Sequence, residues 1–228
     1  FGYPAAAPVW LSYCRKFIER YGGRKVERAR DLLEHAVSAA PAEFARPLYL
    51  LYARFEEQHG MPRAMMRVLD RAVAQLPVGE RLDMYYVYIA KASEYFGAAK
   101  TRPIYDAALQ ALPDAQVGVL ALRYAAMERR LGDLDRARAI YQYAAQATDP
   151  KSNPTFWNVY HKFECVHGSE DTFKDMLRLR RTVRAQYEQV SVNTTASVGN
   201  VNVNKQSGGG STDEMAEFNA ALKRKHVE

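Results

Sequence analysis

Cysteine is scarce in this chain, which has 228 residues and only two cysteines, Cys14 and Cys165. Two distant cysteines do not supply the spacing of a zinc motif, and they are typical of free thiols in a reducing compartment. No apolar run approaches the roughly 20 residues that a membrane-spanning helix needs. The first ten residues also lack the basic and hydrophobic segments of a signal peptide, and they contain no initiator methionine. We therefore expect no membrane contact, and we expect the chain to be part of a longer protein.

Catalytic motifs are missing as well. The sequence has no phosphate-binding loop, no nucleophile elbow and no pair of carboxylates in a plausible cleft. We therefore predict no enzyme, no catalytic residue and no cofactor. The formal net charge of +6 permits contact with nucleic acid or with an acidic partner, without requiring either. Strand patterns are absent before residue 190, so an all-α protein is expected.

Three residue types recur with one period of about 36 residues, which predicts a repeat architecture. The glycines of this series are Gly23, Gly60, Gly97, Gly132 and Gly168. The prolines are Pro41, Pro77, Pro113 and Pro150. A glutamate precedes each glycine by three or four residues, at Glu19, Glu56, Glu94, Glu128 and Glu164. We interpret the recurring glutamate as part of the repeat architecture.

Each repeat has the pattern of a helical hairpin. Aromatic residues at a spacing of three, such as Tyr49, Tyr52 and Phe55, share one face of a first helix. A glycine, which can adopt the left-handed conformation, then ends that helix. In the second helix, small residues seven apart, such as Ala137 and Ala144, allow another helix to approach closely. The residues predicted to define this packing are Trp10, Tyr52, Phe55, Ala108, Ala137, Ala144, Trp157, Tyr160 and Phe163.

The predicted fold is an all-α, right-handed superhelical solenoid of about five hairpins. The expected hairpins are residues 8–41, 42–77, 78–113, 114–150 and 151–190, within a solenoid of residues 1–190. The third hairpin carries Val87, Ala90 and Ser93 where the repeat otherwise has aromatic residues, so its packing is less certain from the sequence. Residues 191–212 are rich in Ser, Asn and Gly and are predicted to form a flexible linker. Residues 213–228 are predicted to be a short amphipathic helix or a disordered tail.

The stretch FWNVYHKFECVHGSEDTF, residues 156–173, concentrates residue types that bind metals. On a helix, His161, Glu164 and Cys165 could converge because they lie three and four positions apart. The alternative is that Trp157 and its aromatic neighbours pack in the core while the polar residues lie at the surface. We favour the second interpretation, and so predict no metal site.

A basic face is predicted on the last helix of the solenoid. Five cationic residues fall within an arc of about 160° at 100° per residue: Lys174, Arg178, Arg180, Arg181 and Arg184. One interpretation is the polar outer face that a terminal solenoid helix needs. The other is weak contact with RNA phosphates or with an acidic partner. We favour the first and retain the second as a hypothesis.

The repeat unit resembles the half-a-TPR (HAT) repeat, most clearly in WNVYHKFECVHG at 157–168 and ARAIYQYA at 137–144. Longer segments, including LYLLYARFEEQHG at 48–60 and DRARAIYQYAAQATDP at 135–150, resemble the C-terminal repeats of the Syf-type pre-mRNA-splicing factor family, also called the xeroderma pigmentosum group A-binding protein family. This resemblance implies a nuclear, non-enzymatic scaffold subunit of the NineTeen complex of the spliceosome. Its implied partners are other NineTeen-complex proteins and an intron-binding RNA helicase. The alternatives are an RNA-binding repeat module and a TPR-like peptide receptor.

Overall fold

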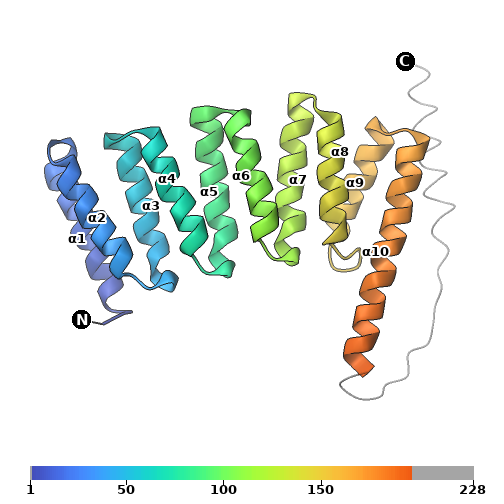
Figure 1. Ribbon diagram of the computed structural model, residues 1–228, viewed down its shortest axis with the longest axis horizontal. Helices are drawn as coiled ribbons and strands as arrows, with labels where there is room; N and C mark the ends of the chain where they lie inside the picture. Colours follow the sequence, from blue (N-terminus) through green and yellow to red (C-terminus); the bar gives the residue numbers. More distant parts are fainter. Residues whose placement is uncertain (1, 197–228) are drawn as a thin grey trace. The chain divides into compact units, whose positions relative to one another are not determined.

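The computed structural model describes residues 2–196, and within that range it contains ten α-helices, one short 3-10 helix and no strand (Figure 1). The predicted all-α class is therefore confirmed. No helix in this range combines the length and the apolar character that a membrane crossing requires. The predicted tail, residues 213–228, and most of the predicted linker lie outside the described residues. The chain divides into two compact units, Phe1–Leu112 and Pro113–Glu228.

The first unit consists of three helical hairpins. Its helices are α1 (Ala6–Tyr21), α2 (Val26–Ala39), α3 (Ala42–His59), α4 (Pro62–Gln75), α5 (Val78–Phe96) and α6 (Ala98–Ala111), with the 3-10 helix η1 (Gly22–Arg24) between α1 and α2. Consecutive helices pair as α1 with α2, α3 with α4 and α5 with α6. The hairpins join through contacts of α3 with α1 and α2, and of α5 with α4. Packing between neighbours in the sequence is what a helical repeat requires.

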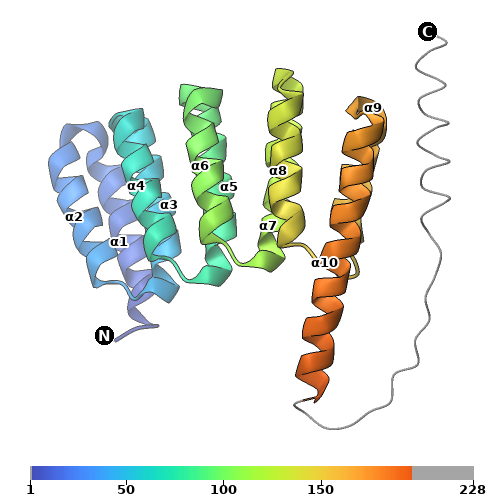
Figure 2. The same cartoon turned by 45° about the vertical axis from the view of Figure 1, so that its right-hand side comes forward.

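The second unit consists of two hairpins, formed by α7 (Asp114–Leu131), α8 (Leu134–Gln146), α9 (Pro154–His167) and α10 (Glu170–Ala196). Helix α8 packs against both α9 and α10. Helix α10 continues to Ala196, past the predicted start of the linker at residue 191. No glycine or proline interrupts it before Gly199, and an existing helix gains one hydrogen bond for each added residue. Helix α10 has 27 residues, whereas α9, with which it forms a hairpin, has 14. Figure 2 shows that α10 extends well past the end of α8.

The hairpin glycines have two different roles. Gly132 adopts the expected left-handed conformation, whereas the ψ angle of Gly97 is −168°, outside that region. Both glycines have positive φ angles, 85° and 69°. Gly60 and Gly168 do not, so conformational freedom does not explain them. A Cβ at Gly60 would collide with the carboxylate of Glu56, and a Cβ at Gly168 would collide with Glu164. At these two turns glycine is needed for space.

The core is formed by the aromatic faces of the first helices packed against apolar residues of the second helices, such as Leu33, Leu69 and Tyr141. Eight of the nine residues predicted to define packing are buried, and the exception, Trp10, is half-buried against His35. In the second unit Tyr141 stacks on Tyr160, with ring centroids 5.1 Å apart. The third hairpin differs from expectation, because Tyr85 and Tyr88 fill its core. Taking Glu94 as the repeat glutamate had shifted the register and assigned core positions to Val87, Ala90 and Ser93, which are half-buried or exposed.

Candidate functional site

The stretch at residues 156–173 does not assemble a metal site in the structure. His161 and Cys165 are neighbours, with Nδ1 and Sγ 3.7 Å apart. Glu164 is engaged elsewhere, by Arg138 and Thr172. Among the described residues, no group of three or more His, Cys, Asp or Glu side chains could hold a metal ion.

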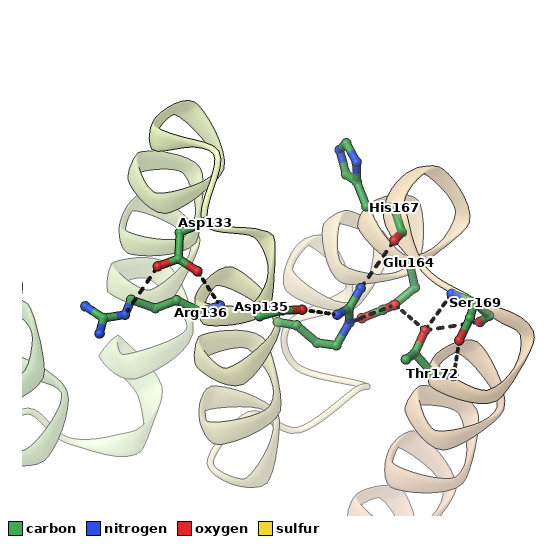
Figure 3. Close-up of polar contacts among 8 residues, drawn as sticks. Asp133, Asp135, Arg136, Glu164, His167, Ser169 and Thr172 are labelled. Atoms are coloured by element: carbon green, nitrogen blue, oxygen red, sulfur yellow. Dashed lines mark hydrogen bonds and ion pairs between the residues drawn. The ribbon is translucent and has the colours of Figure 1, made fainter.

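Glu164 is instead the centre of a buried network that joins α8, α9 and α10 (Figure 3). The Nε of Arg138 donates to its carboxylate at 3.0 Å, and the Thr172 hydroxyl donates to the other oxygen at 2.9 Å. Arg138 also donates to the backbone carbonyl of His167 at 3.3 Å and pairs with Asp135 at 3.0 Å. Glu164 is fully buried, so these donors compensate for the loss of its hydration.

The same arrangement recurs in the first unit, where Arg30 of α2 holds the buried Glu56 of α3. Its Nε and Nη2 donate to the two carboxylate oxygens at 2.6 and 2.8 Å, which is a bidentate pair. In both pairs the arginine precedes the glutamate by 26 residues. The architectural role predicted for the recurring glutamate therefore applies to Glu56 and Glu164.

The glutamate series needs correction, however. Glu19 and Glu94 are exposed, and they do not occupy the position of Glu56. Stepping by 36 from Glu56 reaches Ala92, Glu128 and Glu164, and stepping by 36 from Arg30 reaches Met66, Arg102 and Arg138. One repeat therefore has Met and Ala where the others have Arg and Glu. The substitution of Met and Ala in this repeat was hidden when the glutamates were located by counting back from the glycines. Glu94 lies three residues before its glycine and was taken as the repeat glutamate, although the other glutamates lie four residues before theirs.

The resolved pKa shifts in the described part of the chain all move groups away from neutral pH. Burial raises the pKa of Tyr88 to about 12 and that of Cys14 to about 11. The pKa of Glu34 is lowered, chiefly by its hydrogen bond from Arg71. A general acid or base for catalysis needs a pKa close to the working pH. The shifts are those of packed tyrosines and structural ion pairs.

The basic face predicted on α10 is largely neutralised by acids of the same helix. Lys174 pairs with Glu170 at 2.5 Å, Arg178 with Asp175 at 2.9 Å and Arg184 with Glu188 at 3.1 Å. Of the two remaining predicted cations, Arg180 is half-buried and Arg181 is exposed. The structure therefore places all five on α10, interleaved with carboxylates. The positive charge of this face is therefore smaller than its cations alone indicated.

A different charged surface, which the sequence analysis missed, lies on the first unit between α2 and α4. It is a groove of about 790 Å³ whose lining includes Arg30, Arg63, Arg67 and Arg71. Two helices that belong to different hairpins contribute these arginines, so no single segment of the sequence displays the cluster. The spacing of Arg63, Arg67 and Arg71, four residues apart on one helix, was the one local signal.

Comparisons with known proteins identify relatives of the whole chain. The family described as "Pre-mRNA-splicing factor Syf1/CRNKL1 C-terminal HAT repeat" matches residues 1–227. Pre-mRNA-splicing factor SYF1 of Mycosarcoma maydis is 49% identical over 187 residues, which are 82% of this chain and 17% of the relative. The human protein of that name is 46% identical over 197 residues, covering 86% of this chain and 23% of the relative. The Neurospora crassa protein is 43% identical, with 98% and 28% covered. The chain thus spans less than a third of the length of these relatives.

Proposed function

Because this chain belongs to the Syf1/CRNKL1 family of pre-mRNA-splicing factors, within the part described as its C-terminal HAT repeat, we propose that it is a non-enzymatic scaffold in pre-mRNA splicing. In this proposal it works in the nucleus as part of a subunit of the NineTeen complex. It holds other proteins of that complex, and an intron-binding RNA helicase is a further candidate partner. The match over residues 1–227 is the observation that carries the assignment to splicing.

The distribution of charge supports protein contacts over RNA contacts. Three of the five cations on the basic face of α10, for which RNA contact was the less favoured interpretation, already pair with carboxylates of their own helix. Each such carboxylate repels phosphate and reduces the number of counterions that RNA binding would release. The core aromatic side chains, such as Trp157 and Tyr160, are buried and offer no platform on which bases could stack.

Co-purification tests this function directly. We expect a tagged copy of the chain, expressed in cells, to recover NineTeen-complex proteins, detected by immunoblot, to the same extent with and without nuclease. A variant with Arg178→Ala and Arg181→Ala should recover them equally well. Loss of recovery after nuclease treatment would make the chain an RNA-recognition module.

Titration with a short RNA gives the complementary measurement. We expect a Kd of roughly 10⁻⁴ to 10⁻⁶ M at physiological salt, which weakens steeply as salt is added. Nanomolar and sequence-selective binding would contradict the scaffold proposal.

A further inference from the structure

The arginine-lined groove of the first unit has a defined floor and walls. Helix α2 contributes Arg30 and Glu34, and α4 contributes residues from Arg63 to Arg71. Helix α3 lies between these two helices (Figure 1), and its almost fully buried Tyr52 and Glu56 form the floor of the groove. Tyr52 is only 5% exposed, and its hydroxyl donates to Glu34 at 3.0 Å, so its position is fixed.

The arginines of this groove fall into two groups. Arg30 is held by Glu56, and Arg71 donates to both oxygens of Glu34 at 2.7 and 3.0 Å. Arg63 and Arg67 are exposed, and in the part of the chain that the structure describes no ion pair involves either of them. They are one turn apart on α4, and therefore project from the same face. The groove thus presents two guanidinium groups that are free to bind an external anion.

An apolar groove adjoins the charged one and shares Arg63 with it. It has a volume of about 430 Å³ and lies between α4 and α6, above α5. Its lining includes the apolar side chains of Met66, Phe96 and Ile104, with Lys100 as a second cation. Met66 occupies the repeat position that Arg30 occupies in the charged groove. The charged groove therefore has Arg30 and Glu56 where the next repeat has Met66 and Ala92, and this substitution gives the two neighbouring grooves different chemical character.

We propose that these two grooves together bind an acidic peptide segment of a partner protein. Carboxylates of the segment pair with Arg63 and Arg67, and one bulky apolar side chain enters the groove at Met66. Guanidinium groups bind carboxylates well because the fork of donors matches the two oxygens. This inference names a partner class for the proposed scaffold and rests on that function.

A peptide fits these grooves better than RNA does. The floor tyrosine is buried, so it cannot stack on a base. An apolar groove beside the arginines suits a leucine or phenylalanine side chain, which a nucleic acid does not have.

Fluorescence anisotropy with the full chain tests the proposal. The probes are short labelled peptides in which acidic residues flank one leucine or phenylalanine, together with peptides in which Asn and Gln replace the acids. We expect the acidic peptides alone to bind. Arg63→Ala with Arg67→Ala should weaken binding about tenfold or more, since hydrogen bonds to charged groups are the strong ones. The matched control, Arg129→Ala with Arg130→Ala, removes the same charge from exposed positions of α7 and should leave binding unchanged.

A third variant, Met66→Gln, tests the apolar groove. It should weaken binding of the leucine and phenylalanine peptides and leave binding of an all-acidic peptide unchanged. Circular dichroism establishes that every variant is folded. The proposal is wrong if no acidic peptide binds, if the two arginine pairs have equal effects, or if oligouridine of matching length binds this groove more tightly than any peptide. Nuclease-resistant recovery of splicing proteins by the unaltered chain, together with no binding of any acidic peptide to it, would refute this site while leaving the scaffold function intact.

Discussion

Replacing Arg138 by methionine removes the main partner of a carboxylate that has no access to water. Glu164 is 0% exposed, and the Arg138 side chain is 17% exposed. Breaking a buried ion pair by removing one partner costs about 3–5 kcal/mol. With Thr172 still donating to Glu164, we expect Arg138→Met to lower the free energy of unfolding by about 3 kcal/mol.

The chain itself supplies the compensating substitution. Met66 and Ala92 occupy, in another repeat, the positions of Arg138 and Glu164. Glu164→Ala alone leaves Arg138 with Asp135 and partial exposure to water, so it should cost about 1.5–3 kcal/mol for the lost charged hydrogen bond. The double variant removes both charges together. We expect it to be more stable than Arg138→Met alone, because the coupling energy between the two sites, about 3 kcal/mol, should exceed what Glu164→Ala costs by itself.

Unfolding in urea measures these free energies of unfolding, and because urea is uncharged it does not screen the ion pairs as a salt would. Trp10 and Trp157 are the two tryptophans, one in each unit, so a Trp10→Phe background leaves Trp157 as the reporter of the unit that contains the pair. Arg136→Met is the control, because Arg136 lies on the same helix with its side chain 45% exposed and should change stability by less than about 0.5 kcal/mol. If the double variant is no more stable than Arg138→Met, the unpaired carboxylate is not the source of the loss.

Three further predictions test packing, turn geometry and the absence of a metal. Ala144→Phe should lower the free energy of unfolding by about 1–3 kcal/mol, because Ala144 is fully buried, whereas Ala107→Phe at an exposed position should have little effect. Gly60→Ala should also destabilise, since its Cβ would displace the carboxylate below it, whereas Gly79→Ala meets nothing within 4 Å and should stabilise by about 0.4–1 kcal/mol. Thermal melting should be unchanged by zinc or a chelator if residues 156–173 hold no metal, and a fall of several degrees on chelation would contradict this.

Much of the fold could be predicted because the signals are local and repeated. An aromatic spacing of three, a turn glycine and a proline at the next helix start recur along the chain, and each acts within one hairpin. Pro41, Pro77 and Pro113 directly precede α3, α5 and α7 in the structure. Periodicity therefore predicted helical hairpins without information on tertiary contacts. The Syf-type resemblance added the family, which spacing alone could not supply.

The side-chain pairs were harder to predict, because they join residues of different helices. Arg30 and Glu56 are far apart in sequence, and nothing within either helix indicates that they bond. Counting from the glycines placed Glu94 in the series, although the equivalent position is Ala92. A constant step of 36 residues, applied to both helices, would have aligned Arg30 with Met66 and shown that both members of the pair change together.

The replacement of an Arg–Glu pair by Met66 and Ala92 affects both the packing of the repeat and the surface that it exposes. The position of Arg30 lies at the edge of a groove between successive second helices, so the residue there both stabilises the hairpin junction and lines the groove. An arginine at this position requires a buried acid beneath it, because a guanidinium at 29% exposure stabilises the fold chiefly through that partner. A methionine carries no charge and needs no buried acid, and the position equivalent to that acid is held by the buried Ala92. Replacing an Arg–Glu pair by Met and Ala together therefore changes what a groove can bind, while the helices keep their packing. In this way neighbouring grooves of an array of helical repeats can accept different ligands.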